Sequence, residues 1–177
     1  MSDLYVSWSE YHQNIEKLVA QIYHSQWTFN QIVCIAKGGL RVGDLLCRLY
    51  NCPLAILSAS SYGGENNRVR GEIRFSQHLS MTTANLGDRL LLVDDLADSG
   101  VSLQASLNWL KYHYTHVQDI RTAVLWCKDC SQIKPDYYVE YLTDNPWIHQ
   151  PFEYYEEVTP ADIAEKYTPL SVEQSTK

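Results

Sequence analysis

The sequence has no apolar run that approaches the roughly 20 residues needed to span a bilayer. Its first residues, Met-Ser-Asp-Leu-Tyr, lack the basic start and the apolar core of a secretion signal. It also has no internal repeat and no low-complexity segment, which excludes solenoid and fibrous architectures. We therefore expect a globular cytoplasmic protein that does not insert into a membrane.

Basic residues are scarce. Lys and Arg number 14 against 21 Asp and Glu, which gives a formal net charge of −7 and a pI of about 5.3. This balance argues against a general nucleic-acid surface, so we expect no nucleic-acid partner. An anionic small substrate is compatible with it, because local cations or a metal ion can hold an anion within a pocket.

The five cysteines are an odd number, and Cys34 and Cys47 fall within apolar patterns. Both features favour a reducing compartment over a disulfide framework. The spacing Cys127-x-x-Cys130 matches half of a zinc site, but no second pair of Cys or His is spaced to complete it. We therefore expect two reduced thiols at these positions.

With 177 residues, of which 45% are hydrophobic, the chain is long enough for one domain with a substantial core. We expect a single domain over residues 1–167 and a frayed polar tail at 168–177. Apolar runs predict strands at about 32–36, 54–58, 90–93, 120–126 and 137–142, and helical spacing predicts helices at about 9–25, 42–50, 103–114 and from 159. The alternation predicts an α/β fold with a central, mostly parallel sheet and flanking helices.

Two helix starts carry capping signals. Ser7 and Glu10 fit a capping box, and Ser102 is the predicted cap of the helix at 103–114. Pro160 is at the first position of the predicted last helix.

The stretch Arg89–Leu103 combines an apolar strand, three acids and a Ser/Gly turn that leads into a helix. The acids are Asp94, Asp95 and Asp98, and they repel one another unless a cation or hydrogen-bond donors are present. Carboxylates can hold a metal ion or hydroxyl groups, and a turn at a helix N-terminus can hold a phosphate. The stretch therefore predicts a site for a ligand with both kinds of group.

A second strand, turn and helix occur around Lys37-Gly38-Gly39. Exposed amides at such a turn can bind phosphate, and glycines allow a close approach of the ligand. A tight turn without any ligand is the alternative interpretation.

Residues 60–88 change character, with strong turn chemistry followed by Arg68, Arg70 and Arg74 alternating with apolar residues. This pattern predicts a hairpin arm that is either a mobile lid or a solvated surface hairpin.

Four strand ends carry residues suited to a binding site. They are followed by Lys37, by Ser60 and its neighbours, by Asp94, and by Lys128. Ligands of open parallel sheets bind beyond the carboxyl ends of the strands, so we expect these groups to lie together.

The segment Leu91–Ser102 resembles the phosphoribosyl pyrophosphate (PRPP) motif of the type I phosphoribosyltransferases. Ile35–Gly39 is similar to the pyrophosphate loop of that family, and Ser61-Tyr62 to the start of its mobile catalytic loop. The resemblance covers about residues 8–158 and is strongest to the purine salvage enzymes for xanthine, guanine and hypoxanthine. It implies the type I fold, with a small hood built from terminal segments.

The resemblance also implies a reaction, in which the phosphoribosyl group passes from PRPP to a purine and pyrophosphate is released. Asp98 is the implied base, and Asp94 and Asp95 are implied to hold ribose hydroxyls and, partly through water, Mg²⁺. The 5′-phosphate of PRPP is assigned to Asp98, Ser99, Gly100, Val101 and Ser102. Pyrophosphate is assigned to Lys37, Gly38 and Gly39, and the catalytic loop (about 60–88) to the closure that excludes water.

Base binding is assigned by resemblance to Lys128, Trp147 and Ile148, the last two within a hood at about 143–158. The family usually forms homodimers or homotetramers. Three other functions remain open from the sequence. They are a PRPP- or nucleotide-sensing regulator on the same scaffold, a phosphoribosyltransferase for another base, and a magnesium-dependent phosphohydrolase that uses the acids alone.

Overall fold

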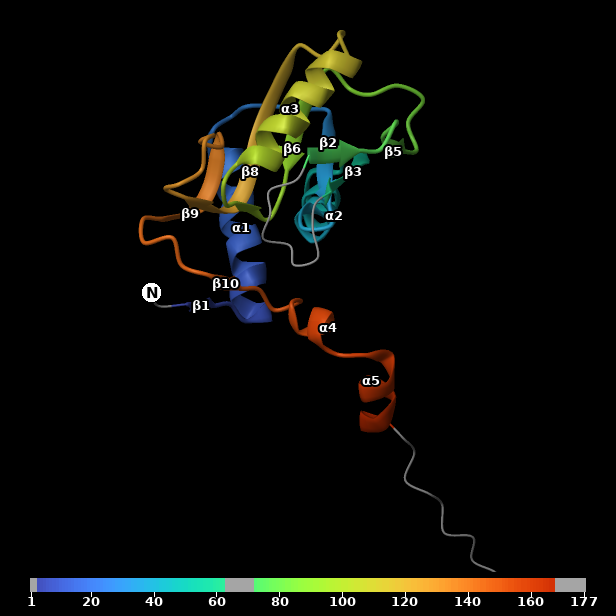
Figure 1. Ribbon diagram of the computed structural model, residues 1–177. Coiled ribbons are helices and arrows are strands. Elements are labelled where there is room, and N and C mark those ends of the chain that lie inside the picture. The colour runs from blue at the N-terminus through green and yellow to red at the C-terminus, as the bar shows by residue number, and fades with distance from the viewer. Residues whose placement is uncertain (1–2, 63–71, 168–177) are drawn as a thin grey trace, which may run out of the picture.

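The computed structural model describes residues 3–62 and 72–167 (Figure 1). The strands of the main sheet are β2 (Gln31–Ala36), β3 (Leu54–Tyr62), β4 (Glu72–Phe75), β5 (Ser80–Met81), β6 (Arg89–Val93), β7 (Leu96–Ala97), β8 (Asp119–Lys128) and β9 (Tyr137–Leu142). The helices are α1 (Trp8–His24), α2 (Gly39–Tyr50), α3 (Val101–His113), α4 (Tyr154–Glu157) and α5 (Pro160–Lys166). Two short strands, β1 (Leu4–Tyr5) and β10 (Ile148–His149), pair with each other.

The main sheet has the order β4-β3-β2-β6-β8-β7, with β5 beside β3 and β9 beside β8. The pairs β2–β3, β2–β6, β6–β8 and β8–β9 are parallel, whereas β4 and β5 run antiparallel to β3. The predicted α/β fold with a mostly parallel sheet is confirmed.

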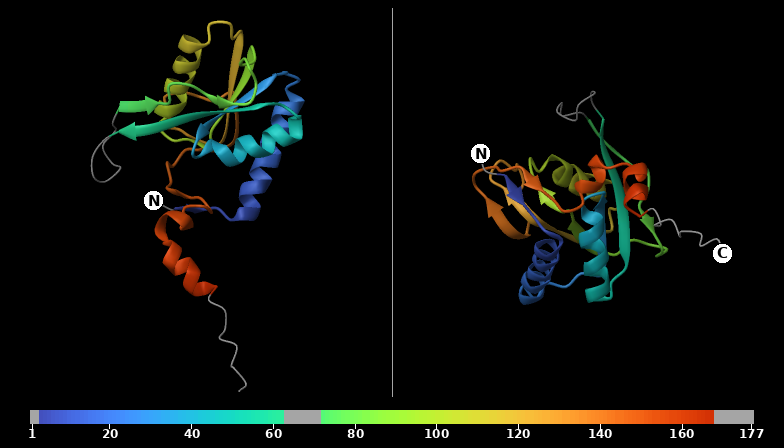
Figure 2. Two further views of the ribbon diagram at one scale, coloured as in Figure 1. Left: turned by 90° about the vertical axis from the view of Figure 1, so that its right-hand side faces the viewer. Right: turned by 90° about the horizontal axis from the view of Figure 1, so that it is seen from below.

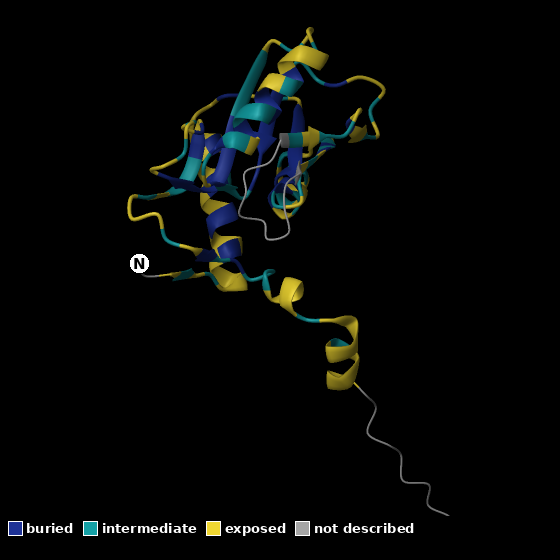
Figure 3. Cartoon of the chain, viewed as in Figure 1, coloured by how far each residue is buried: buried dark blue, intermediate teal, exposed yellow. Residues whose placement is uncertain are grey.

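Helices cover both faces of the sheet, with α1 and α2 on one face and α3 on the other (Figures 1 and 2). Successive residues of a strand point to opposite faces, so a strand covered on both sides must be apolar throughout. In β2, Ile32 and Cys34 pack with α1 and α2, whereas Val33 and Ile35 belong to the core beneath α3. Figure 3 shows the resulting continuous buried layer.

Helix α1 begins with the predicted capping box. Ser7 is the N-cap, its hydroxyl accepts from the Glu10 N–H, and the Glu10 carboxylate accepts from the Ser7 N–H at 2.8 Å. Ser7→Ala is expected to lower the melting temperature by about 2–4 °C, the effect of a typical N-cap loss in a domain of this size. Thermal unfolding followed by circular dichroism measures this, with Ser9→Ala as the control outside the cap. Equal melting temperatures for the two variants would show that the cap contributes nothing.

The prediction that Ser102 caps the third helix is wrong. Helix α3 starts at Val101, two residues before the predicted start at 103, and its N-cap is Gly100, which has a φ of 72° and no capping side chain. Gly100 adopts this left-handed conformation without the steric cost that a Cβ would bring. Ser102 therefore lies in the first turn of α3, where its hydroxyl is not used as a cap.

The segment 60–88 is not one loop. Residues 59–62 of β3 pair with 72–75 of β4, which confirms the predicted hairpin. Ser61 and Tyr62 form the end of β3, and the predicted loop residues 63–71, with Arg68 and Arg70, lie outside the described residues. The chain then returns along β3, where β5 pairs with its start, and Leu79 and Leu86 enter the core. Mobility of the hairpin stays a prediction.

The hood of residues 143–158 is built from both ends of the chain, as predicted. The N–H of Leu4 donates to the Trp147 carbonyl at 2.8 Å, and the N–H of Val6 donates to the His149 carbonyl at 3.0 Å. Beyond the hood, α5 extends away from the sheet and is almost wholly exposed (Figures 2 and 3). Helix α5 has the predicted start, with Thr159 as the N-cap and Pro160 in the first turn.

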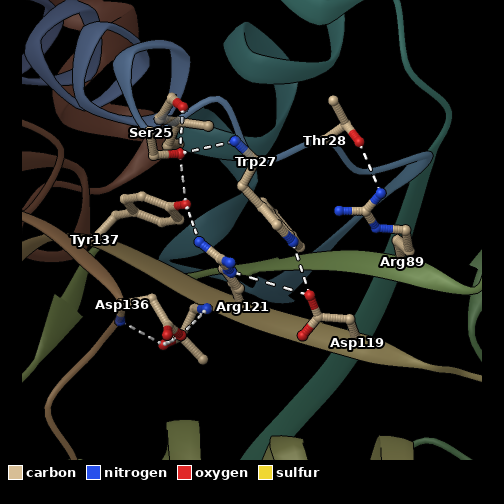
Figure 4. Close-up of polar contacts among 10 residues, drawn as sticks. Ser25, Trp27, Thr28, Arg89, Asp119, Arg121, Asp136 and Tyr137 are labelled. Atoms are coloured by element: carbon tan, nitrogen blue, oxygen red, sulfur yellow. Dashed lines mark hydrogen bonds and ion pairs between the residues drawn. The ribbon is translucent and has the colours of Figure 1, made fainter.

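A group of polar contacts lies at the amino ends of the strands, on β8, β9 and the loop after α1 (Figure 4). Nε1 of Trp27 donates to Asp119 at 2.7 Å, and the Arg121 guanidinium donates to the Tyr137 hydroxyl at 2.9 Å. The guanidinium carbon of Arg121 also lies 4.7 Å from the Trp27 ring centroid. These contacts join the loop after α1 to β8 and β9, at the edge opposite to the predicted site.

None of the helices in residues 3–62 and 72–167 combines the length and the hydropathy that a bilayer crossing requires.

Candidate active site

The carboxyl ends of β2, β3, β6 and β8 meet at one edge of the sheet, because these strands are parallel neighbours. Lys37 directly follows β2, Asp94 directly follows β6, and Lys128 is the last residue of β8. The predicted convergence of the strand ends is therefore present in the structure.

A cavity of about 360 Å³ lies at this edge. It joins the glycine turn, the first two acids and the first turn of α3, and residues of β3, β4 and the hood contribute to its lining. Its lining consists of Ile35, Ala36, Lys37, Gly38, Ala59, Ser60, Ile73, Asp94, Asp95, Ser102, Phe152 and Glu156. The sequence did not single out Phe152 or Glu156, because their approach to the cavity depends on the path of the hood.

Gly38 and Gly39 bring the turn after β2 into direct contact with the acids. A Cβ on Gly38 would lie 2.3 Å from Oδ1 of Asp95, and a Cβ on Gly39 would lie 2.5 Å from the Val93 carbonyl oxygen. The peptide bond between Ala36 and Lys37 is cis. The two glycines therefore let the turn approach the acid side chains, at Gly38, and the backbone of β6, at Gly39, more closely than any side chain would allow.

Asp94 and Asp95 are an adjacent acid pair with restricted access to water. The Asp94 carboxylate accepts from the Asp95 N–H at 3.0 Å. Burial, and then the negative charge of Asp95, raises the pKa of Asp94 well above its ordinary value. Burial also raises the pKa of Asp95, although a hydrogen bond from Gln150 acts in the opposite direction. The ligand-free pair therefore disfavours two negative charges.

Because the buried acid pair disfavours two negative charges, we expect Asp94→Asn to stabilise the ligand-free protein in a pH-dependent way. A carboxyl with a raised folded-state pKa keeps its proton after the unfolded chain has lost its own, so stability falls as the pH rises above about 4 towards the folded-state pKa. The neutral asparagine avoids this loss. We expect Asp94→Asn to raise the melting temperature of the ligand-free protein, and to do so more at about pH 8 than at about pH 5.

The exposed Asp44, paired with Arg48 at 2.9 Å, supplies the control substitution Asp44→Asn. The melting temperature of Asp44→Asn, relative to that of the wild type, should not increase between about pH 5 and about pH 8. An Asp94→Asn variant that is less stable than the wild type at both pH values would contradict the interpretation of the acid pair.

Asp98, in the turn before α3, forms an ion pair with Lys128 at the end of β8. Nζ of Lys128 lies 3.0 Å from Oδ1 of Asp98, and the lysine side chain is 7% exposed against 60% for the aspartate. The strand β8 extends two residues beyond its predicted end, which buries the lysine at the sheet edge. The pair thus offers an accessible carboxylate that is oriented by a buried cation.

The turn before α3 is shaped for an anion. The N–H groups of the first helical turn have no partner within the helix, and the helix dipole adds positive potential there. Gly100 lies against the loop at Ser131 and Ile133, where a Cβ would be 2.4 Å from the Ser131 hydroxyl oxygen. The backbone of Ser99 is fixed by a hydrogen bond from the Gln132 N–H at 3.0 Å. Ser102, in the first turn of the helix, lines the cavity.

The two hood residues assigned to the base are placed differently. The Trp147 side chain is 63% exposed, so its ring is available for stacking. Ile148 is 4% exposed and packs in the core with α1, so any contact with a base would come from its backbone. Neither Trp147 nor Lys128 lines the 360 Å³ cavity.

The acid pair can supply some, but not all, of the ligands that a bound cation requires. No group of three or more His, Cys, Asp or Glu among the described residues is arranged to hold a metal ion. Mg²⁺ is often bound by one or two carboxylates together with substrate phosphates and water. The two adjacent carboxyls with raised pKa values therefore fit an ion that arrives with a phosphorylated substrate. The five cysteines are free thiols, as predicted for Cys127 and Cys130.

A larger cavity of about 830 Å³ lies between the end of α1, residues 26–29 and the end of α2. None of the predicted site residues lines it, and its wall is mainly apolar. The chemistry at the carboxyl edge, rather than cavity size, identifies the candidate active site.

Comparisons with known proteins show the family of the chain. A family model described as phosphoribosyl transferase domain matches residues 7–157. The chain is 28% identical over 154 residues to xanthine-guanine phosphoribosyltransferase of Gluconobacter oxydans, covering 84% of this chain and 83% of the relative. A solved purine phosphoribosyltransferase from Pyrococcus horikoshii is 25% identical, with a TM-score of 0.66 and coverage of 86% and 94%. The xanthine-guanine-hypoxanthine phosphoribosyltransferase of Helicobacter pylori shares the fold, with a TM-score of 0.71, 20% identity and coverage of 93% and 99%.

Proposed function

Because the chain belongs to the phosphoribosyltransferase family, we propose that it transfers the phosphoribosyl group of PRPP to a 6-oxopurine. The products are the nucleoside monophosphate and pyrophosphate, and the candidate bases are guanine, xanthine and hypoxanthine. One observation carries the proposal: the acid pair, the glycine turn and the first turn of α3 line the same cavity. The purine specificity of the curated relative supports the choice of base.

PRPP has two anionic ends, and the site offers one place for each. The turn of residues 98–102, with the uncapped start of α3, is suited to the 5′-phosphate. Lys37, Gly38 and Gly39 are suited to the pyrophosphate, through one ammonium group and a closely approaching backbone. Asp94 and Asp95 lie between these two places and face the ribose hydroxyls.

Mg²⁺ would be held by Asp94 and Asp95 together with oxygens of PRPP and water. When bound, it would supply positive charge to the leaving pyrophosphate. The chain itself stabilises the negative charge on the leaving pyrophosphate through Lys37 and backbone amides. These donors are preorganised at the point where that charge develops.

In the reaction, a bond forms between a nitrogen of the five-membered purine ring and C1 of the ribose. The bond between C1 and the pyrophosphate oxygen breaks, and the nitrogen loses its proton. Asp98 accepts this proton, and Lys128 orients the carboxylate at 3.0 Å and faces the exocyclic oxygen of the base. The β3–β4 hairpin closes over the cavity and excludes water, which would otherwise hydrolyse the activated sugar.

Product analysis with PRPP, Mg²⁺ and one base at a time tests the proposal. We expect nucleotide from guanine, xanthine or hypoxanthine, and none from adenine or uracil. Binding of PRPP without nucleotide from any base would replace the proposal by the sensor function. Release of phosphate from nucleotides without a base would favour the phosphohydrolase.

A further inference from the structure

Gln150 connects the hood to the acid pair by a direct hydrogen bond. Its Nε2 donates to Oδ2 of Asp95 at 2.6 Å, and the residue is 8% exposed. Gln150 directly follows β10, two positions after Ile148. The hydrogen bond therefore joins the segment assigned to the base to a carboxylate assigned to the ribose.

The position of Gln150 is determined by the packing of the hood. On one side, β10 pairs with β1, and the two strands lie beside each other below the main sheet (Figure 1). On the other side, the N–H of Glu153 donates to the Gln150 carbonyl at 3.0 Å. The Phe152 ring centroid lies 4.2 Å from the guanidinium carbon of Arg41 and 5.9 Å from the Tyr11 ring centroid. A shift of the hood would therefore move the Gln150 amide relative to Asp95.

Two polar groups near Asp95, from Tyr11 and Gln150, lack hydrogen-bond partners within the described part of the ligand-free protein. Among the described residues, Oε1 of Gln150 and the Tyr11 hydroxyl are buried without a hydrogen-bond partner. Burial, and then the charge of Asp95, raises the pKa of Tyr11, so the phenol is a neutral donor within the field of that carboxylate. Unpartnered buried polar groups are costly. A ligand whose binding gives these groups hydrogen-bond partners therefore binds with a more favourable free energy.

We propose that Gln150 is a positioning residue that couples base binding to PRPP binding, an inference that rests on the proposed function. A base that contacts the hood at Trp147 and Ile148 fixes β10 and with it the amide of Gln150. The amide then holds Asp95 in the orientation that receives the ribose hydroxyls. Each ligand stabilises the arrangement that the other requires, and such coupling is reciprocal.

Calorimetric titration of PRPP with Mg²⁺ tests the coupling, in the presence and absence of 9-deazaguanine. This analogue has carbon in place of the nitrogen that would accept the ribose, so no turnover occurs. In the wild type, the analogue should lower the Kd for PRPP by about fivefold or more. In Gln150→Leu, the Kd for PRPP should rise and should no longer respond to the analogue.

Gln31 provides the matched control. It is also a buried glutamine, 2% exposed, and its amide bonds to Thr83 and Gly87 at the opposite edge of the sheet. Gln31→Leu should lose stability and keep the coupling. Wild-type coupling in Gln150→Leu would overturn the inference, as would a wild-type protein that binds both ligands independently, and both results leave the proposed function intact. A wild-type protein that does not bind PRPP would overturn the function as well.

Discussion

Asp98→Asn is expected to reduce kcat by about 10²–10⁴-fold, the range for loss of a general base. Asparagine keeps the size of the side chain and can still contact Lys128, but it cannot accept a proton from the purine. The affinity for PRPP should stay close to the wild-type value, because the 5′-phosphate contacts come from the backbone of the turn. Steady-state kinetics, together with a PRPP titration of the variant, separates the two effects.

Asp129→Asn is the control for this prediction. Asp129 is an exposed acid in the connection after β8, and its carboxylate accepts from the Tyr141 hydroxyl at 2.5 Å. It has the same charge and lies one residue from Lys128, so general electrostatic effects should be similar. The control should retain the wild-type kcat. If Asp98→Asn also retained it, another group would have to remove the proton.

Gly38→Ala is expected to lower kcat/KM for PRPP by about 10²-fold or more, the scale expected when reacting groups are displaced by about 1 Å. The added methyl group would lie 2.3 Å from Oδ1 of Asp95 and 2.9 Å from Oδ1 of Asp94. Either the acid pair or the turn must move, and both are parts of the proposed site. Kinetics at varied PRPP concentration, with the base saturating, measures the effect.

Gly87→Ala introduces an equally short contact away from the site. Its Cβ would lie 2.3 Å from Oδ1 of Asn30, at the amino edge of the sheet. This variant should lose stability and keep its kinetic constants. An active Gly38→Ala variant would show that the turn after β2 does not approach the substrate closely.

The strand, turn and helix units could be predicted from the sequence because their signals are local. The strand at 90–93 is buried on both faces and is therefore a continuous apolar run. The acids that follow this strand and the glycines that follow β2 were predicted to lie together for a second reason, which is that parallel strands end at one edge of the sheet. The structure supplied the order of the strands, which depends on pairing between distant segments.

Contacts within the hood could not be predicted from local signals. Gln150 and Asp95 are 55 residues apart, and no periodicity or motif links them. The stacking of Arg41 on Phe152 likewise depends on how the hood crosses α2. The sequence did not predict the start of α3 at a left-handed glycine, because serine is a favourable cap residue and Ser102 was therefore chosen. Tight packing against Ser131 instead requires glycine two residues earlier, at Gly100.

The proposed reaction is the transfer of a phosphoribosyl group to an oxopurine at the carboxyl edge of the sheet. The most direct test quantifies nucleotide and pyrophosphate together after incubation with PRPP, Mg²⁺ and guanine. We expect equimolar GMP and pyrophosphate, with neither product formed when the base is omitted. Pyrophosphate released without any nucleotide, or PRPP bound and left intact with every oxopurine, would contradict it.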